Sequence, residues 1–119
     1  ALHIMMRYVD SGLVDYLNIV WGASSLNEMS MSRVIPPLGS PSAPFLEKVK
    51  GVKSQLNIPI LHSCGIADVA TARHALESNS VDLVGMTRAH IADPHIIKKV
   101  TDGNEELSGI DLAGLVVIV

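Results

Sequence analysis

Aromatic residues and an excess of basic charge are both lacking in this sequence. One Trp, two Tyr and one Phe among 119 residues make a poor platform for stacking nucleobases. Nine Lys and Arg stand against twelve Asp and Glu, a formal net charge of −3, whereas a nucleic-acid-binding surface needs a basic footprint to displace counterions. We therefore expect no nucleic-acid partner and a core built from aliphatic side chains.

Cysteine and long apolar runs are scarce as well. Cys64 is the only cysteine, so no intramolecular disulfide can form and nothing indicates an oxidising compartment. The longest apolar run, 112–119, contains a glycine and falls well short of the roughly 20 residues of a membrane-spanning helix. Residues 1–7 lack the layout of a signal peptide and do not begin with Met. These features favour a soluble, cytoplasmic protein without a membrane partner, whose chain starts inside a longer one.

The sequence does contain a regular alternation of two patterns. Hydrophobic residues make up 48% and charged residues 18%, enough for a folded core in one compact domain. Short segments rich in β-branched residues predict strands, and apolar residues at helical spacing predict helices between them. We expect strands at 14–20, 59–62 and 81–86, helices at 1–11, 42–56, 68–78 and 93–100, and a long Ser- and Pro-rich loop at 23–41.

Local signals mark the ends and inner faces of these helices. Gly12 is placed to end the first helix, Asp68 to cap the third, and Asp93 with Pro94 to start the fourth. The residues expected to face inward are Phe45, Val49, Val52 and Leu56 on the second helix, and Ala72, Ala75 and Leu76 on the third.

The order of the elements predicts the fold class. Strands that are apolar on both faces and alternate with helices are typical of parallel strands joined by crossover helices. The chain is therefore α/β with a parallel sheet, and periodic β/α units of this kind suit a barrel or a doubly wound sheet. Three strands by themselves close neither a barrel nor a doubly wound sheet.

Ligands of parallel α/β proteins bind where the strands end, which here means the loops 21–41, 62–67 and 85–92. The last two are expected to lead into helix N-termini, whose free amides bind anions. Gly65 would let the backbone approach a phosphate closely, and Thr87 and Arg88 follow the third strand, where a guanidinium suits phosphate. On spacing alone a plainer interpretation is preferred, with Arg88 paired to a nearby acid and Gly65 a turn glycine.

Three segments carry a resemblance to one family. Residues 81–94, Val-Asp-Leu-Val-Gly-Met-Thr-Arg-Ala-His-Ile-Ala-Asp-Pro, resemble the eighth strand and following loop of the old yellow enzyme superfamily, above all its trimethylamine dehydrogenase and 2,4-dienoyl-CoA reductase branch. Residues 58–68 resemble the seventh strand with its phosphate loop, and 14–19 resemble the sixth strand. The similarity extends over about residues 5–105 and is most specific in the eighth-strand motif.

The resemblance implies a partial (β/α)8 barrel, or TIM barrel, that binds FMN. Its last three strands, six to eight, would be neighbours in chain order with the helices on one face. Residues 1–106 would form the C-terminal portion of this barrel, and 107–119 a divergent tail. The FMN phosphate would be held by the backbone amides of Cys64, Gly65, Thr87 and Arg88, with the Arg88 guanidinium alongside. The family usually has Gly where Cys64 stands and often Arg where Gly65 stands, so the loop after the seventh strand departs from the family's pattern.

The resemblance also implies that part of the enzyme is missing from this chain. The family's first five strands hold the residues at the flavin ring, and the cysteines of its iron–sulfur cluster follow the barrel. A single cysteine cannot hold such a cluster. We expect a fragment of an FMN-dependent oxidoreductase of the NADH:flavin oxidoreductase type, with NAD(P)H or an amine as electron donor, that is inactive by itself.

The alternative is a non-catalytic phosphate-binding β/α module that self-associates through open sheet edges. The coding DNA on either side distinguishes the two hypotheses. An in-frame continuation that encodes five more β/α units would support the fragment, whereas clean start and stop signals would support the module.

The histidines and the cysteine offer other interpretations. His90 and His95 are five residues apart, not the three or four that share a helix face, and His62 with Cys64 would need a third ligand to hold a metal. His62 stands at a strand end, either near the flavin pocket or simply partly buried. Cys64 is interpreted as a small turn-lining residue rather than a reactive thiol. No metal site is expected.

Overall fold

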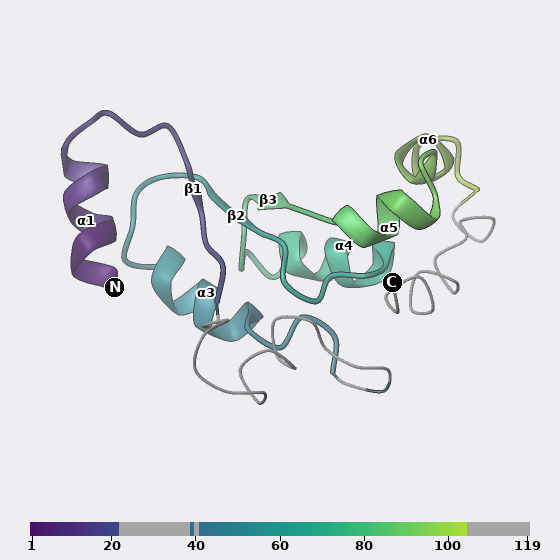
Figure 1. The fold of residues 1–119 in the computed structure, drawn as a ribbon, viewed down its shortest axis with the longest axis horizontal. Helices are drawn as coiled ribbons and strands as arrows, with labels where there is room; N and C mark the ends of the chain where they lie inside the picture. Colours follow the sequence, from purple (N-terminus) through teal and green to yellow (C-terminus); the bar gives the residue numbers. More distant parts are fainter. Residues whose placement is uncertain (22–38, 40, 105–119) are drawn as a thin grey trace.

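The computed structural model describes residues 1–21, 39 and 41–104. The elements along this part of the chain are α1 (Leu2–Asp10), β1 (Leu17–Asn18), α3 (Leu46–Lys53), β2 (Ile60–His62), α4 (Val69–Glu77), β3 (Leu83–Val84), α5 (Thr87–Ala92) and α6 (Ile96–Thr101) (Figure 1). The predicted loop 23–41 lies outside the described residues except at 39 and 41, and so does the whole tail 107–119. The helices within residues 1–21, 39 and 41–104 have at most nine residues, well short of a membrane-spanning length.

The strands form one parallel sheet in the order β1-β2-β3. Leu17 lies opposite Ile60 in the first pair of strands, and Leu61 lies opposite Leu83 in the second. The α/β class and the predicted parallel pairing in chain order are thereby confirmed. The strands are shorter than predicted, two residues each in β1 and β3 and three in β2, because a strand ends where its hydrogen-bond ladder ends and not where the apolar pattern ends.

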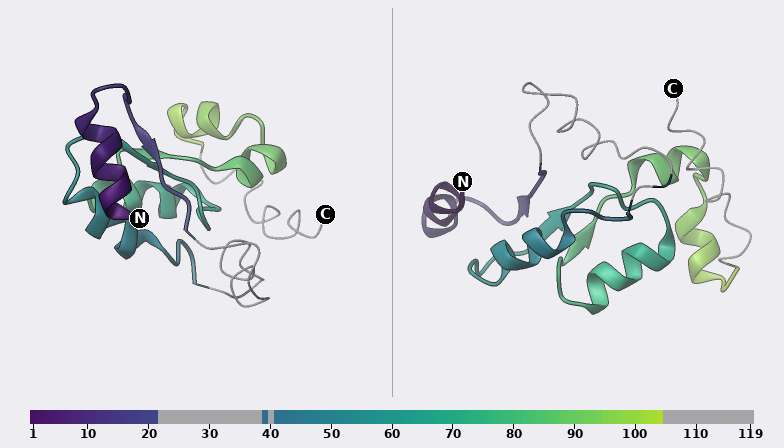
Figure 2. Two further views of the ribbon diagram at one scale, coloured as in Figure 1. Left: turned by 60° about the vertical axis from the view of Figure 1, so that its left-hand side comes forward. Right: turned by 90° about the horizontal axis from the view of Figure 1, so that it is seen from below.

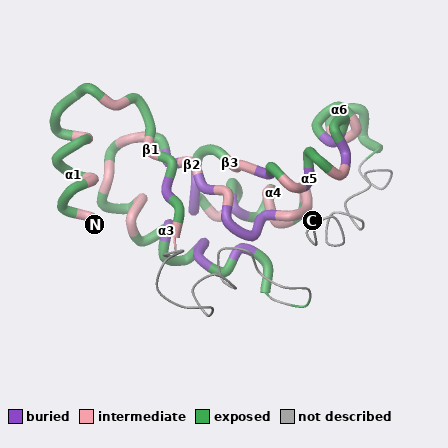
Figure 3. Tube along the Cα trace, viewed as in Figure 1, coloured by how far each residue is buried: buried purple, intermediate pink, exposed green. Residues whose placement is uncertain are grey.

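Helices α3 and α4 lie on the same side of the sheet (Figures 1 and 2). Val49 of α3 and Ala75 of α4 are fully buried and belong to the same core cluster as Ile60 of β2. Figure 3 shows buried segments along β1 and β2 and on the adjoining part of α3. This cluster is aliphatic, as the composition predicted.

The start of α4 agrees with the prediction, but one of its side chains does not. Asp68 Oδ1 accepts a hydrogen bond from the Thr71 amide at 2.6 Å and so caps the helix. Ala75 is buried and Ala72 is partly buried, as expected, whereas Leu76 is 45% exposed. Successive residues are about 100° apart around a helix, so Leu76 lies beyond the narrow stripe of α4 that packs against the sheet. The predicted inward position of Leu76 is therefore wrong.

The segment after β3 also differs from the prediction. The expected loop 85–92 consists only of Gly85 and Met86, and α5 follows at once. Ala89 of this helix is fully buried in the core cluster, and this packing stabilises a helix whose first turn has no side-chain cap. The last helix begins at 96 rather than 93, after a turn in which Asp93 accepts from the His95 amide at 3.0 Å.

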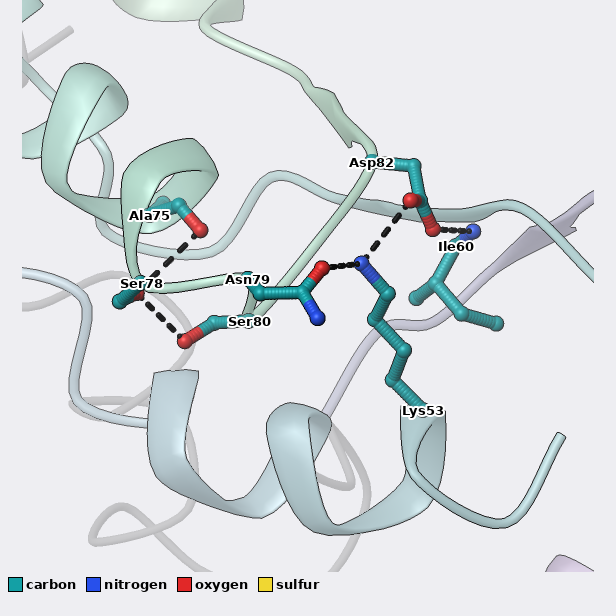
Figure 4. A network of polar contacts seen from close by, with 7 residues as sticks. All are labelled: Lys53, Ile60, Ala75, Ser78, Asn79, Ser80 and Asp82. Atoms are coloured by element: carbon teal, nitrogen blue, oxygen red, sulfur yellow. Dashed lines mark hydrogen bonds and ion pairs between the residues drawn. The ribbon is translucent and has the colours of Figure 1, made fainter.

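A polar cluster joins the elements at the N-terminal end of the strands (Figure 4). Lys53 Nζ donates to Asn79 Oδ1 at 2.7 Å and to Asp82 Oδ1 at 2.9 Å, while Asp82 Oδ2 accepts from the Ile60 amide at 2.9 Å. The bond from Lys53 and that from the Ile60 amide lower the pKa of the Asp82 carboxyl. The cluster joins the end of α3 to β2 and β3.

Two apolar surfaces of the described residues remain uncovered. Helix α1, which ends before Gly12 as predicted, lies at the edge of the described fold (Figure 1). None of its residues is fully buried, although Met5 packs against the core cluster. On the side of the sheet away from α3 and α4, Leu83 is 45% exposed, Val20 58% exposed and Leu61 partly buried. Alternate strand residues point to opposite faces, so these side chains mark an open face of the sheet.

Candidate functional site

The ends of β2 and β3 bring two chain segments into direct contact. The Gly85 amide donates to the carbonyl of His62 at 2.9 Å. A Cβ placed on Gly85 would lie only 2.6 Å from the Cβ of Ser63, so this approach is open to glycine alone. The segments 63–65 and 85–88 therefore emerge side by side on the C-terminal rim of the sheet, where α/β proteins bind ligands.

Gly65 shapes the first of these segments. Its φ of +72° lies in the left-handed region, and a Cβ there would come within 2.8 Å of Pro44 Cδ. Its carbonyl accepts from the Ala43 amide at 2.9 Å. The turn role of Gly65 considered from the sequence is thus confirmed. Beside it, Cys64 is a free thiol and only 6% exposed.

Backbone amides on both segments are without acceptors in the described part of the chain. On the first segment these are the amides of Ser63, Cys64 and Gly65, and on the second those of Met86, Thr87 and Arg88. Backbone N–H groups are obligatory donors, and successive unpaired amides in turns form anion-binding concavities. All four residues named from the sequence, Cys64, Gly65, Thr87 and Arg88, have such an amide.

Arg88 has an unusual environment for a charged side chain. Its Nη1 is buried and has no hydrogen-bond partner among the described residues. The acid nearest to it in the sequence, Asp93, is engaged 2.7 Å away by Lys99. The plainer interpretation, an ion pair between Arg88 and a nearby acid, is not seen within the part of the chain that the structure describes. A buried guanidinium nitrogen without a partner is rare and suits an anionic ligand.

His62 was placed at a strand end by the sequence, and the structure makes it fully buried. Its Nδ1 lies 2.7 Å from the Ile19 carbonyl oxygen, whereas Nε2 has no partner among the described residues. Burial lowers the pKa of the His62 ring, which favours its neutral form. The contact of Nδ1 with a carbonyl oxygen, which can only accept, then places the one ring proton on Nδ1. No group of three or more His, Cys, Asp or Glu side chains suited to a metal occurs within residues 1–21, 39 and 41–104.

Comparison with known proteins identifies relatives of this chain. It is 45% identical to a probable N-methylproline demethylase of Rhizobium meliloti over 106 aligned residues. This alignment covers 89% of this chain and 16% of the relative. It is 41% identical over 96 residues to a multifunctional alkene reductase/demethylase OYE of Caballeronia cordobensis, covering 81% and 14%. It is 43% identical over 97 residues to an N,N-dimethylglycine/sarcosine dehydrogenase of Chromohalobacter salexigens, covering 82% and 14%.

These relatives are much longer than this chain, which spans 14–16% of their length. No protein-family model and no solved structure matches it. The three relatives are oxidoreductases of one superfamily, and the aligned segment takes up at least 81% of this chain in each case. The chain therefore belongs to the old yellow enzyme and trimethylamine dehydrogenase-like superfamily.

Proposed function

We propose that this chain is a segment of an FMN-dependent oxidoreductase and contributes the phosphate-binding rim of the flavin site. The observation that carries the proposal is the buried Nη1 of Arg88, which has no partner within the described part of the chain. Arg88 lies three residues after Gly85, which contacts Ser63, and the amides of both rim segments have no acceptor among the described residues. A flavin phosphate is a dianion, and converging amides with one guanidinium are the donors that such a group requires.

The proposed cofactor contacts are Cys64, Gly65, Thr87 and Arg88. All four are supported as backbone donors, because their amides have no acceptor among the described residues. Arg88 adds the positive charge. Bound FMN would supply hydride transfer, and this chain's residues would hold its phosphate and exclude water from the guanidinium.

We further propose that the sheet represents strands six to eight of a (β/α)8 barrel. In such barrels the inward side chains of eight parallel strands fill the interior, and the helices lie outside. The open face with Leu61 and Leu83 lies opposite α3 and α4, as the inner wall of a barrel would. A parent chain as long as the relatives would have ample residues to complete the barrel, since this chain spans only 14–16% of the relatives' length.

The electron donor of the parent protein is proposed from the same comparisons. The names of two relatives contain N-methylated amino acids: one is a probable N-methylproline demethylase and the other an N,N-dimethylglycine/sarcosine dehydrogenase. We propose a substrate of this chemical class or NAD(P)H as the donor of the parent. The residues that would choose between them belong to strands outside this chain.

The test of the proposed site is a calorimetric titration of the 119-residue chain with FMN and with riboflavin, which lacks the phosphate. We expect FMN to bind more tightly by about ten- to a hundredfold, as charge-assisted phosphate contacts of about 1.5–3 kcal/mol would give. Both affinities should be weak, because the residues at the flavin ring are missing. Equal affinities for the two ligands would contradict phosphate anchoring. Equal affinities together with dimers in sedimentation would favour the self-associating module, whose basis is the open edges of β1 and β3.

We also expect the chain to lack flavin reductase activity. The resemblance places the groups that contact the flavin ring on the family's first five strands, and catalysis depends on such positioned groups. The measurement is steady-state oxidation of NAD(P)H with added FMN, compared with free FMN at the same concentration. Turnover above the free-flavin background would overturn this expectation.

A further inference from the structure

The pairing of β1 with β2 stops abruptly at Ile19. The amide of Leu17 donates to the Pro59 carbonyl at 3.0 Å, and that of Ile19 donates to the Leu61 carbonyl at 2.9 Å. In a parallel ladder the next bond would run from the Ser63 amide to the Ile19 carbonyl. That bond is not formed among the described residues.

The imidazole of His62 takes the place of the missing bond. Its Nδ1 lies 2.7 Å from the Ile19 carbonyl oxygen that the Ser63 amide would otherwise use. The main-chain carbonyl of His62 accepts from the Gly85 amide at 2.9 Å on the other side. One residue thereby joins β1 to the segment after β3 at the rim, and it leaves the Ser63 amide free next to Gly85.

His62 is not placed to touch a ligand on the open face of the sheet. It shares its face of β2 with Ile60, two residues earlier, and that face packs against α3 and α4. Its side chain is fully buried. A buried polar ring is costly unless it is hydrogen-bonded. The bond from Nδ1 to Ile19 offsets part of this cost, while Nε2 has no partner among the described residues.

We propose that His62 is a positioning residue of the rim, which ends the β1–β2 ladder at Ile19 and thereby keeps the Ser63 amide available as a further phosphate donor. The phosphate part of this inference rests on the function proposed above. The ladder part rests only on the hydrogen bonds of this chain. The two parts are therefore tested by separate measurements.

Amide hydrogen exchange of the isotope-labelled chain tests the ladder directly. In the wild type the Ile19 amide should be protected and the Ser63 amide should exchange without protection. The nitrogen resonances of His62 should show the proton on Nδ1. A protected Ser63 amide, or a proton on Nε2 alone, would overturn the inference without any substitution being made.

Two substitutions separate the hydrogen bond from the packing of the ring. His62→Leu keeps a buried side chain of similar size but has no donor, so the Ser63 amide should bond to Ile19 and become protected. His62→Asn places an amide nitrogen near the position of Nδ1 and should keep Ser63 unprotected. An unprotected Ser63 in His62→Leu would overturn the ladder role.

The affinity ratio of FMN to riboflavin tests the phosphate part. We expect His62→Leu to lower this ratio by about tenfold through the loss of one amide donor, and His62→Asn to restore most of it. Asp82→Asn is the matched control, because it weakens the cluster at the opposite end of the strands (Figure 4) and should lower stability without changing the ratio. An unchanged ratio in His62→Leu would overturn the positioning role.

The outcomes distinguish this inference from the proposed function. If wild type binds FMN and riboflavin equally, the phosphate site is refuted and with it the phosphate part of the inference, while Ser63 protection still decides the ladder part. If wild type prefers FMN and His62→Leu keeps the full preference, the phosphate site stands and only the role of His62 is refuted.

Discussion

Arg88→Ala is expected to abolish the preference of the chain for FMN over riboflavin. The substitution removes the only charge of the proposed site, so FMN affinity should fall by about ten- to a hundredfold while riboflavin affinity stays unchanged. Arg88→Lys keeps the charge but loses the fork geometry of the guanidinium and should retain part of the preference. The measurement is a calorimetric titration of both ligands against each variant.

Arg7→Ala is a suitable control for this experiment. Arg7 is an exposed residue of α1, and α1 lies at the other end of the described chain from α5 (Figure 1). Its removal changes the net charge of −3 by the same one unit. It should leave both affinities as in wild type. If Arg88→Ala and Arg7→Ala lower FMN affinity to the same extent, the effect is general electrostatic attraction, and a specific phosphate contact at Arg88 is refuted.

The stability of Arg88→Ala gives a second, independent readout. Removing an arginine from an internal ion pair destabilises a protein by about 3–5 kcal/mol, because the partner is left as an unpaired buried charge. The Nη1 of Arg88 has no partner among the described residues, so its removal should leave the melting temperature unchanged or raise it. A marked fall would indicate that Arg88 has a structural role rather than a ligand to bind.

Gly85→Ala is expected to have the largest effect on stability. The added Cβ would lie 2.6 Å from the Cβ of Ser63, and backbone on both sides would have to move. Overpacking of this kind costs about 1–3 kcal/mol. Since the contact also aligns the two rim segments, the variant should lose its preference for FMN. Urea denaturation gives the loss of stability, and the titration described above gives the affinity ratio.

Gly51→Ala provides the matched control for the glycine substitution. Gly51 lies inside α3, and a Cβ there would meet nothing within 4 Å. Alanine should therefore stabilise this variant by about 0.5–1 kcal/mol through helix propensity, with no change in the affinity ratio. If Gly85→Ala unfolds at the urea concentration of wild type, the rim segments are not in the contact described here.

Local patterns were sufficient to predict much of the fold. The helix start at Asp68 was predicted correctly because a side-chain cap depends only on residues three positions apart. The parallel pairing in chain order was predicted correctly because short apolar strands separated by helices cannot form hairpins. Family membership followed from the motif at 81–94, which the relatives support.

The errors lie where packing in three dimensions overrides local pattern. Leu76 has the spacing of an inward residue, yet the sheet meets only a narrow stripe of α4. The residues 87–92 have no strong cap and so resembled a loop, yet burial of Ala89 makes them helical. Strand lengths were overestimated because apolar character says nothing about where a ladder of hydrogen bonds stops.

Periodicity, capping and motif were enough to predict the elements, their order, the parallel sheet and the superfamily. They also indicated Gly65 and Arg88 as rim residues. Three features are visible only in the folded chain: Gly85 contacts Ser63, the Nη1 of Arg88 is buried without a partner among the described residues, and His62 takes the carbonyl of Ile19. Each of these depends on contacts between residues more than 20 positions apart or on burial by the whole fold, and neither contacts nor burial of this kind leave a local pattern in the chain.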